Sequence, residues 1–310
     1  MKSYDYSKRD ENAKVVFYVP LWKRDGITLD TFDDYWSNVH GPVCSRLPGQ
    51  HQYWQFHVAH SDGGMWPTLD GISYNTQEAE QFDGIAELSF RSDDDRKTWF
   101  QAAGMLMDDE HNIFSKAIGY NTATGNSITY VDGIENPIPN GAQDLIKLFV
   151  TFKQSSSVGV VDFRNFLSKK FAPALAKSDY LLKLKLHMFE EVDNTRPPAA
   201  GVAHAQPESE QFQAIIEIAF KNRFFMERFF ASNEYNETIA DQPKYFKQIS
   251  AFPQRTAFTF VQDDEITLAG MRGSKVADLI LNIGATNQVR EDIIALMMNN
   301  TPFNLKTKKY

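Results

Sequence analysis

The sequence contains a single cysteine, Cys44, among 310 residues. One cysteine excludes an internal disulfide framework and any metal site built on several thiolates. Basic residues are also few: Lys and Arg number 32 against 40 for Asp and Glu, which gives a formal net charge of −8. This acidic balance makes nucleic acid and anionic membranes poor partners. The chain has no 18-residue uncharged apolar run and no apolar segment near its start, which predicts a soluble, cytoplasmic protein.

Common cofactor and nucleotide motifs are absent as well. The chain has no GxGxxG, no GxxxxGKS/T and no HExxH, the signatures of dinucleotide, phosphate and zinc-protease sites. Aromatic residues are abundant instead, with 24 Phe, 12 Tyr and 5 Trp, or 13% of the chain. Such an excess either packs a core or lines a cavity for a flat apolar ligand, and the composition leaves both open.

One segment near the start recurs later in the chain. The sequence VVFYVPLWKRDGITLDTFDDYWSNVHGP, Val15 to Pro42, resembles LIKLFVTFKQSSSVGVVDFRNFLSKKFAP, Leu145 to Pro173. FDGIAELSF, Phe82 to Phe90, likewise matches FQAIIEIAF, Phe212 to Phe220. The offset is 130 or 131 in every match, which indicates two homologous units of about 125 residues.

Each unit follows the order strand, helix, strand, strand, helix, strand, judged from alternating and 3.6-residue apolar patterns. This order predicts an α+β fold of two ferredoxin-like (βαββαβ) repeats. A sheet covered by helices on one face leaves its other face bare, so the repeats are expected to pack sheet to sheet as an intramolecular α/β barrel. We expect a first unit at 1–133, a linker at 134–143, a second, degenerate unit at 144–263, and a C-terminal helical extension and tail at 264–310.

The first unit carries a helix motif, a bend and an acidic turn that identify a family. The motif and bend consist of Phe32, Tyr35, Trp36, His40, Pro42, Arg46, Leu47, Pro48 and Gly49, and the turn of Asp109-Glu110 before Phe114. This pattern resembles the EthD family within the dimeric α/β-barrel superfamily. The second unit keeps only the skeleton, with Phe171 in the position of His40. The resemblance implies the fold, but related barrels include cyclases, oxygenases, dehydratases, isomerases and haem enzymes, so it implies no single reaction.

His40 is the leading catalytic candidate. It ends an apolar helical stripe just before Gly41-Pro42, and Pro42 disrupts a helix because it clashes with the carbonyl four residues back, at Asn38. The imidazole can therefore leave the stripe, reach a pocket and transfer protons near neutral pH. The structural alternative is that His40 only bonds a free carbonyl at the helix end. Function is favoured because the second unit needs the same kink and manages with Phe171.

His57 and Glu87 are the other catalytic candidates. His57 lies on the second expected strand, and Glu87 lies in the middle of the third. We expect Glu87 inside the barrel, as a general acid or base or as the group that orients His57. His187 and Glu217 are assigned the equivalent places in the second unit and are secondary candidates. The structural alternatives are a shared hydrogen bond for the histidines and a salt bridge for the carboxylates.

Aromatic residues indicate where a ligand binds. The substrate-binding candidates are Trp36, Tyr53, Trp66, Tyr18 and Trp54. Trp66 lies in the long segment 61–81, which we expect to act as a lid on the first unit. The counterpart segment 191–211 is rich in Pro and Ala, and we expect its His204 to be solvated. Cys44 is expected to be a buried structural residue.

These features predict a cofactor-independent acid–base enzyme, a lyase of the dehydratase or cyclase type, for a small hydrophobic, aromatic or polyketide-like molecule. Two alternatives remain open: a cofactor-free monooxygenase of phenolic substrates, and a non-catalytic hydrophobic-ligand-binding or stress-response protein. We expect no metal, because the clustered His51, His57 and His60 have no carboxylate at ligand spacing. Partners other than the small molecule are not expected, neither nucleic acid nor membrane, and the protein is expected to be a monomer or homodimer.

Overall fold

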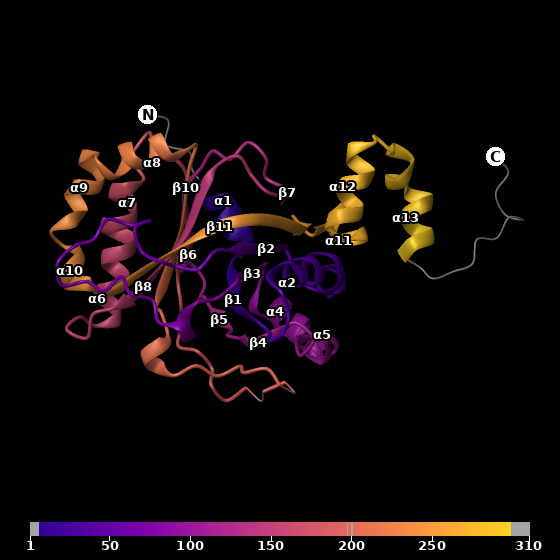
Figure 1. Cartoon of the computed structure of the whole chain (residues 1–310), viewed down its shortest axis with the longest axis horizontal. Helices are drawn as coiled ribbons and strands as arrows, with labels where there is room; N and C mark the ends of the chain where they lie inside the picture. The colour runs from indigo at the N-terminus through magenta and orange to yellow at the C-terminus, as the bar shows by residue number, and fades with distance from the viewer. Residues whose placement is uncertain (1–5, 197, 200, 299–310) are drawn as a thin grey trace, which may run out of the picture.

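The computed structural model of the chain describes residues 6–196, 198–199 and 201–298, so most of the tail expected after the C-terminal helices lies outside the described residues. The fold is mixed α+β, built on a large antiparallel sheet (Figure 1). The strands are β1 (Val15–Lys23), β2 (Gln52–Val58), β3 (Gly84–Phe90), β4 (Phe114–Ala117), β5 (Tyr120–Asn121), β6 (Ser127–Asp132), β7 (Asn140–Gly141), β8 (Ile146–Gln154), β9 (Leu181–Met188), β10 (Ala214–Phe220), β11 (Phe246–Gln262) and β12 (Glu265–Ile266).

Helices lie mainly on the outer faces of the sheet. The α-helices are α1 (Ser7–Asn12), α2 (Leu29–Tyr35), α3 (Gly41–Cys44), α4 (Asp93–Ala102), α5 (Gly104–Glu110), α6 (Val160–Phe166), α7 (Ala172–Leu175), α8 (Arg223–Phe230), α9 (Asn233–Ile239), α10 (Gln242–Tyr245), α11 (Leu268–Arg272), α12 (Ser274–Asn282) and α13 (Glu291–Met298). Two π-helices, η1 (Trp36–His40) and η3 (Leu167–Phe171), each sit between two α-helical turns. Within the described residues, no helix has the length and apolar character needed to cross a membrane.

Strand β11 joins the two halves of the sheet. The strand order β4-β1-β3-β2-β11-β8-β10-β9-β6 contains two groups of four with the order of a ferredoxin-like unit. Residues 246–253 of β11 pair with β8, and residues 254–261 pair with β2. Figure 1 shows β11 crossing the molecule between the helices of the two halves. One continuous strand therefore belongs to both groups.

Strand β6 makes the reciprocal crossing, which corrects one expectation. The expected first unit ends at residue 133 and so includes β6 as its last strand, but β6 pairs with β9 of the second half. The edge position beside β1 is taken by β4, with β5 next to it. The strand path begins at β4 and ends at β6, and these two end strands are close together in the chain, separated only by β5.

Alternation along the strands creates three apolar layers. On β1, Val15, Phe17, Val19 and Leu21 pack with the first-half helices, while Val16 and Tyr18 face the space between the two sheet groups. Residues of both halves fill that space, which we call the barrel interior, among them Phe56, Phe149, Ile215 and Phe252. A third cluster packs the second-half sheet against α6–α10. Each sheet group thus has one face toward its helices and one toward the barrel interior.

The long segment 61–81 leaves the first half and covers the second. Trp66 and Ile72 are buried in the second-half core, and the Trp66 ring lies 5.2 Å from Phe230 and 5.9 Å from Tyr235. Ser73 pairs with β11, donating to Lys247 and accepting from Ile249. The expected lid on the first unit is therefore wrong, since Trp66 fills the space between sheet and helices in the other half.

Segment 191–211 makes the matching crossing onto the first half. Its Ala203 exchanges backbone hydrogen bonds with Ser115 and Ala117 on β4, and its Val202 is buried in the first-half core. His204 is only 3% exposed, so the expectation that it is solvated is wrong. The first-half layer between sheet and helices is consequently completed by residues from the second half.

The π-helix η1 follows from Pro42 and two close approaches to the sheet. Pro42 has no N–H to donate, and the N–H of Gly41 reaches back to the carbonyl of Trp36, five residues earlier. A Cβ at Gly41 would lie 2.6 Å from the ring of Phe260, and one at Gly84 would overlap the ring of Trp36. The expected kink beside His40 is thus a turn of π-helix pressed onto the strands.

The C-terminal extension packs against this same turn. Helix α11 lies on α3 and β11, and α12 lies beside η1. Ser45 donates to the carbonyl of Gly270, and the N–H of Lys275 donates to the side chain of Asn38. Residues 264–298 therefore support the segment that carries His40, and Figure 1 shows α12 and α13 standing away from the barrel beyond it.

Replacing Gly84 with alanine tests the contact between Trp36 and β3. A methyl group there overlaps the Trp36 ring, so Gly84→Ala should lower the free energy of unfolding by about 1–3 kcal/mol. The measurement is urea unfolding followed by circular dichroism. Gly104→Ala is the matched control. A Cβ at Gly104 meets nothing within 4 Å, and alanine favours the helix more than glycine does, so this variant should not be less stable than the parent. Equal stability of the Gly84 variant and the parent would contradict the close approach.

Replacing Trp66 with alanine tests the crossed segments. Trp66 is 3% exposed in the second-half core, so Trp66→Ala should cost about 3–5 kcal/mol of unfolding free energy. Because the ring lies away from the first-half layer, binding of small aromatic molecules there should be unchanged, as followed by the fluorescence of the remaining tryptophans. Loss of that binding without loss of stability would show that segment 61–81 covers the first half instead.

Candidate functional site

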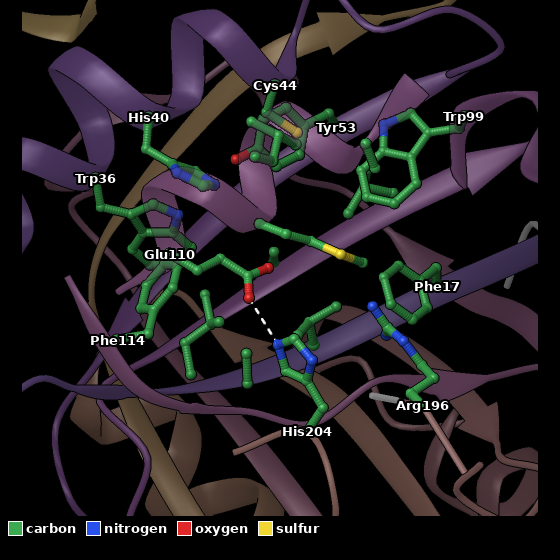
Figure 2. Close-up of a pocket in the computed structure, with 18 residues that line it drawn as sticks. Phe17, Trp36, His40, Cys44, Tyr53, Trp99, Glu110, Phe114, Arg196 and His204 are labelled. Carbon is green, nitrogen blue, oxygen red and sulfur yellow. Dashed lines mark hydrogen bonds and ion pairs between the residues drawn. The ribbon is translucent and has the colours of Figure 1, made fainter. Parts of the chain in front are cut away.

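A cavity lies between the first-half sheet and its helices. It contains about 570 Å³ of empty space, part of it open to solvent. We call it the His40 cavity; Figure 2 shows its lining, which comprises Phe17, Val19, Leu21, Trp36, His40, Cys44, Tyr53, Ala86, Leu88, Trp99, Ala103, Leu106, Met107, Glu110, Phe114, Ala117, Arg196 and His204. Most of these side chains are apolar or aromatic, and the few polar ones converge on the same space.

His40 is held at the cavity wall by a carboxylate. Its Nδ1 lies 2.9 Å from Oδ2 of Asp109, and the imidazole meets the ring of Phe114 edge to face. Asp109 also accepts from the hydroxyl of Tyr35 at 2.6 Å and from the amide of Asn112 at 3.0 Å. The hydrogen bond from His40, together with those two, holds the pKa of Asp109 well below its usual range. Asp109 is therefore ionised at neutral pH and accepts the Nδ1 proton, which leaves Nε2 of neutral His40 as the basic atom.

A second pair of titratable groups faces the same cavity. Nε2 of His204 lies 2.7 Å from Oε2 of Glu110, as the dashed line in Figure 2 marks. Glu110 ends α5, whereas His204 comes from the crossed segment 191–211. Our sequence reasoning noted Glu110 only as part of an acidic turn and set His204 aside. The acidic turn was the one signal in the sequence that pointed to Glu110. The pairing with His204 could not be read from it, because His204 lies 94 residues further along the chain.

Tyr53 and Cys44 form the far wall of the cavity. The hydroxyl of Tyr53 accepts from the side-chain amide of Gln55 at 2.7 Å, and its ring stacks on Phe260 at 5.2 Å. Burial raises the pKa of Tyr53 and that of the Cys44 thiol. Both groups therefore stay protonated at neutral pH. A protonated, buried thiol is a poor nucleophile, which agrees with a structural role for Cys44.

His57 does not line the His40 cavity. It is fully buried behind Trp36, and the two rings stack at 4.5 Å with 19° between their planes. Its Nδ1 lies 2.7 Å from Asp33, which also holds Arg255 through two hydrogen bonds. Burial lowers the pKa of His57, so the ring is neutral near pH 7. The structure thus gives His57 the position of a support for Trp36, where our sequence reasoning predicted a catalytic group.

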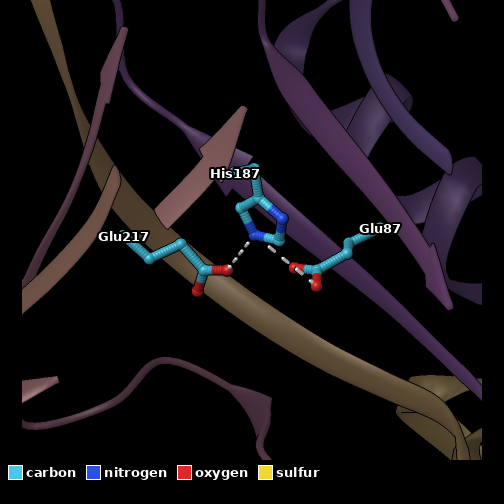
Figure 3. A group of neighbouring side chains, drawn as sticks. All are labelled: Glu87, His187 and Glu217. Atoms are coloured by element: carbon cyan, nitrogen blue, oxygen red, sulfur yellow. Dashed lines mark hydrogen bonds and ion pairs between the residues drawn. The ribbon is translucent and has the colours of Figure 1, made fainter. Parts of the chain in front are cut away.

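Glu87 lies on the opposite face of the sheet from His57. Figure 3 shows Glu87 meeting His187 and Glu217 inside the barrel, the His187 Nε2 lying 3.2 Å from Glu217 and 3.8 Å from Glu87. We expected Glu87 to orient His57 or to act as a general acid or base. Its position prevents it from orienting His57 and keeps it out of the His40 cavity. His187 is also not the counterpart of His57, because the strand register aligns it with Phe56. A one-residue shift reverses the face of a strand.

Lysines neutralise the carboxylates of this interior cluster. Lys185 Nζ lies 2.5 Å from Glu87, and Lys147 Nζ lies 2.6 Å from Glu217. Burial lowers the pKa of Lys147 to about 8. Glu87, His187 and Glu217 present ligand atoms within 4.8 Å of one another, as a metal site requires. A divalent cation would, however, have to displace both lysines from their ion pairs, so this donor set fits a buried charge network better.

Two further candidates face the barrel interior. Tyr18 contacts His187 and Phe189, with ring centroids 5.1 Å and 5.5 Å away. Trp54 lines a separate polar cavity at one end of the barrel, beside Lys185 and Glu87. Neither lines the His40 cavity, so the structure does not bring them together with His40. Of the predicted site residues, the structure brings together His40, Trp36 and Tyr53.

Comparison with known proteins supports the family and little more. The family model described as the EthD domain matches residues 24–117, from the end of β1 to the end of β4. This range contains the motif, the bend and the acidic turn on which our resemblance rested. No curated protein sequence matches the chain significantly.

Similar solved structures cover most of the chain but at low similarity. A putative monooxygenase from Lactobacillus acidophilus NCFM is 12% identical, covering 82% of this chain and 98% of its own, with a TM-score of 0.45. A putative monooxygenase from Fusobacterium nucleatum is 7% identical over the same shares, with a TM-score of 0.47. An anthrone oxidase-like protein is 9% identical, covering 81% of this chain and 94% of its own, with a TM-score of 0.48. These values support no statement about substrate or reaction. The family match is limited in the same way: over residues 24–117 the chain is similar to EthD domains, and the match names no reaction.

Proposed function

We propose that the His40 cavity is the active site of a cofactor-independent acid–base enzyme. The observation that carries the proposal is the His40–Asp109 pair at the wall of an otherwise apolar, aromatic-lined cavity. An ionised carboxylate on Nδ1 keeps the basic Nε2 available and stabilises the imidazolium that forms when Nε2 takes a proton. The mostly apolar and aromatic lining suits a hydrophobic ring compound. The substrate class is therefore a small hydrophobic, aromatic or polyketide-like compound.

The reaction that this arrangement suits best is loss of water from a β-hydroxy carbonyl compound. His40 Nε2 takes the proton from the carbon next to the carbonyl, and the electron pair expels the β-hydroxyl group. The proton shared by Glu110 and His204, which lie 2.7 Å apart, passes to that hydroxyl, which leaves as water. Proton transfer by such positioned groups contributes about 10²–10⁴-fold to a rate. This chemistry makes the protein a lyase of the dehydratase type, and the same groups suit a cyclisation.

Two other functions use the same cavity. His40 can deprotonate an electron-rich phenol or anthrone. The carbanion adds O₂ to form a hydroperoxide, which loses water to leave a quinone, and the protein is then a cofactor-free monooxygenase. The cavity can also hold a hydrophobic molecule without turning it over. Lyase chemistry is preferred because two separate proton-transfer pairs face one cavity, and simple carriage of an apolar ligand requires neither.

We also propose that the two halves descend from one duplicated unit and together form an intramolecular barrel. The support is the shared order of elements, the π-helix at the same place in each half, and the equivalent register of Glu87 and Glu217. In the second half Phe171 replaces His40, and Trp66 occupies the layer between sheet and helices. The proposal therefore gives the chain one active site.

Replacing His40 with phenylalanine tests the catalytic base. Phe171 shows that a phenyl ring fits the same π-helical position, so His40→Phe should fold and still bind aromatic ligands. Turnover of 4-hydroxy-4-phenylbutan-2-one to the unsaturated ketone, followed by absorbance, should fall by about 10²-fold or more. His111→Phe, the same change at an exposed histidine near the same turn, is the control and should keep full activity.

The same assay separates the three functions. Mass spectrometry under nitrogen and under air, with the hydroxyketone and with anthrone, shows whether water is lost or oxygen is gained. Water loss under nitrogen supports the lyase. A product that forms only under air identifies the monooxygenase, and binding of both compounds without turnover identifies a carrier. Undiminished turnover by His40→Phe would refute a catalytic role for His40.

Replacing Asp109 with asparagine tests how His40 is held. A neutral amide no longer fixes the Nδ1 proton, so turnover should fall by about 10²-fold while ligand affinity changes little. The pKa of Asp109 is lower in the folded protein than in the unfolded chain. Its carboxylate therefore stabilises the fold at any pH above the pKa of the unfolded chain, and this contribution is lost as the pH falls toward the pKa of the folded protein. The difference in Tm between parent and Asp109→Asn should therefore be largest near neutral pH and shrink below about pH 4. A difference that grows on acidification would contradict the assignment.

A further inference from the structure

Among the described residues, Arg196 is the one arginine or lysine whose side chain lines the His40 cavity. It stands with 17 other residues around that space, and Figure 2 shows its guanidinium group directed toward Phe17 at the cavity edge. Arg196 lies on the crossed segment 191–211, so the second half supplies it to a cavity of the first half. An obligate positive charge at an otherwise apolar wall needs an explanation.

The guanidinium group is positioned but its donors are unused. Its central carbon lies 5.9 Å from the ring centre of Phe17 and 5.4 Å from that of Phe100, which is the geometry of cation–π contacts. Nη1 fits against Gly119, where a Cβ would stand 3.1 Å away. Among the described residues, no hydrogen bond or ion pair joins Arg196 to a carboxylate or a carbonyl. Five N–H donors are thus available for a ligand.

The nearby acids are committed to other partners. Glu110 is bonded to His204 at 2.7 Å, and Asp193 accepts from the N–H and the hydroxyl of Thr195. Asp109 is bonded to His40, Tyr35 and Asn112. Burial lowers the pKa of Arg196, and the negative charges of Glu110 and Asp193 offset this effect only in part. A ligand that brings its own negative charge would complete the pairing.

We propose that Arg196 binds the carboxylate group of the substrate, which makes the substrate class an aromatic or polyketide-derived carboxylic acid. This inference rests on the proposed function, because it concerns the same cavity. A carboxylate matches the planar fork of a guanidinium group and accepts two parallel hydrogen bonds from it. The apolar rings of the substrate then lie along Phe17, Trp99 and Leu88 toward His40, at the other end of the cavity. The second half, in which Phe171 stands in the place of His40, thereby provides the group that selects the substrate.

Paired probes that differ only in charge test this inference. 2-Naphthoate and 2-naphthamide have the same ring and nearly the same shape, and binding of either is followed by quenching of Trp36 and Trp99 fluorescence. The parent should bind 2-naphthoate about tenfold more tightly than 2-naphthamide, because charge-assisted hydrogen bonds are stronger than neutral ones. A tenfold difference in affinity corresponds to about 1.4 kcal/mol of binding free energy. Arg196→Gln should bind both probes equally, with the affinity for the amide unchanged. Arg196→Lys, which keeps the charge without the fork, should recover part of the preference.

Controls and contrary outcomes are distinct. Lys97→Gln removes an exposed positive charge from α4 outside the cavity and should leave both affinities unchanged. If 2-naphthamide binds the parent as tightly as 2-naphthoate, the inference about Arg196 is wrong while the cavity remains a binding site. Equal loss of both probes in Arg196→Gln would show a structural role only and would also overturn the inference. Failure of the parent to bind either probe would overturn the proposed function together with it.

Discussion

The pairing of one strand with both sheet groups is the constraint on which the rest of the molecule depends. Strand β11 bonds first to β8 and then to β2, and β6 bonds to β9 in the reciprocal way. This double crossing fixes the two groups face to face and fills the space between them with side chains of both halves. It also carries the long segments 61–81 and 191–211 across the molecule. Every site in the protein is therefore assembled from parts far apart in the chain.

The crossing makes the two halves unequal in use. In the second half, Trp66 and Phe171 occupy the layer between sheet and helices, and that layer becomes solid core. In the first half, the same layer holds His40 with Asp109, and segment 191–211 adds His204 and Arg196. One half thus keeps a cavity with chemistry, while the other supplies covering residues and stability. The C-terminal helices α11 and α12 add support to the π-helix that carries His40.

Local patterns allowed much of the fold to be predicted from the sequence. Alternating and helical apolar periods placed the strands and helices of both halves, and the motif around Trp36 and His40 identified the EthD domain. Pro42 predicted the kink beside His40, because a missing donor and a steric clash act within a few residues of the proline. The position of His40, Trp36 and Tyr53 around one cavity follows from these local features.

The remaining assignments failed where they depended on register or on long-range closure. A one-residue difference between β2 and β9 turns His187 into the barrel interior and His57 toward the helices. Glu87 alternates onto the interior face, where Lys185 of the other half forms an ion pair with it. The destination of Trp66, and the pairing of His204 with Glu110, depend on which segment crosses the barrel. The sequence by itself determined the elements and the kink, because those obey local sterics and periodicity. Only the tertiary structure decided which residues complete the cavity, because the crossing of segments between the two halves brings together side chains that no local pattern connects.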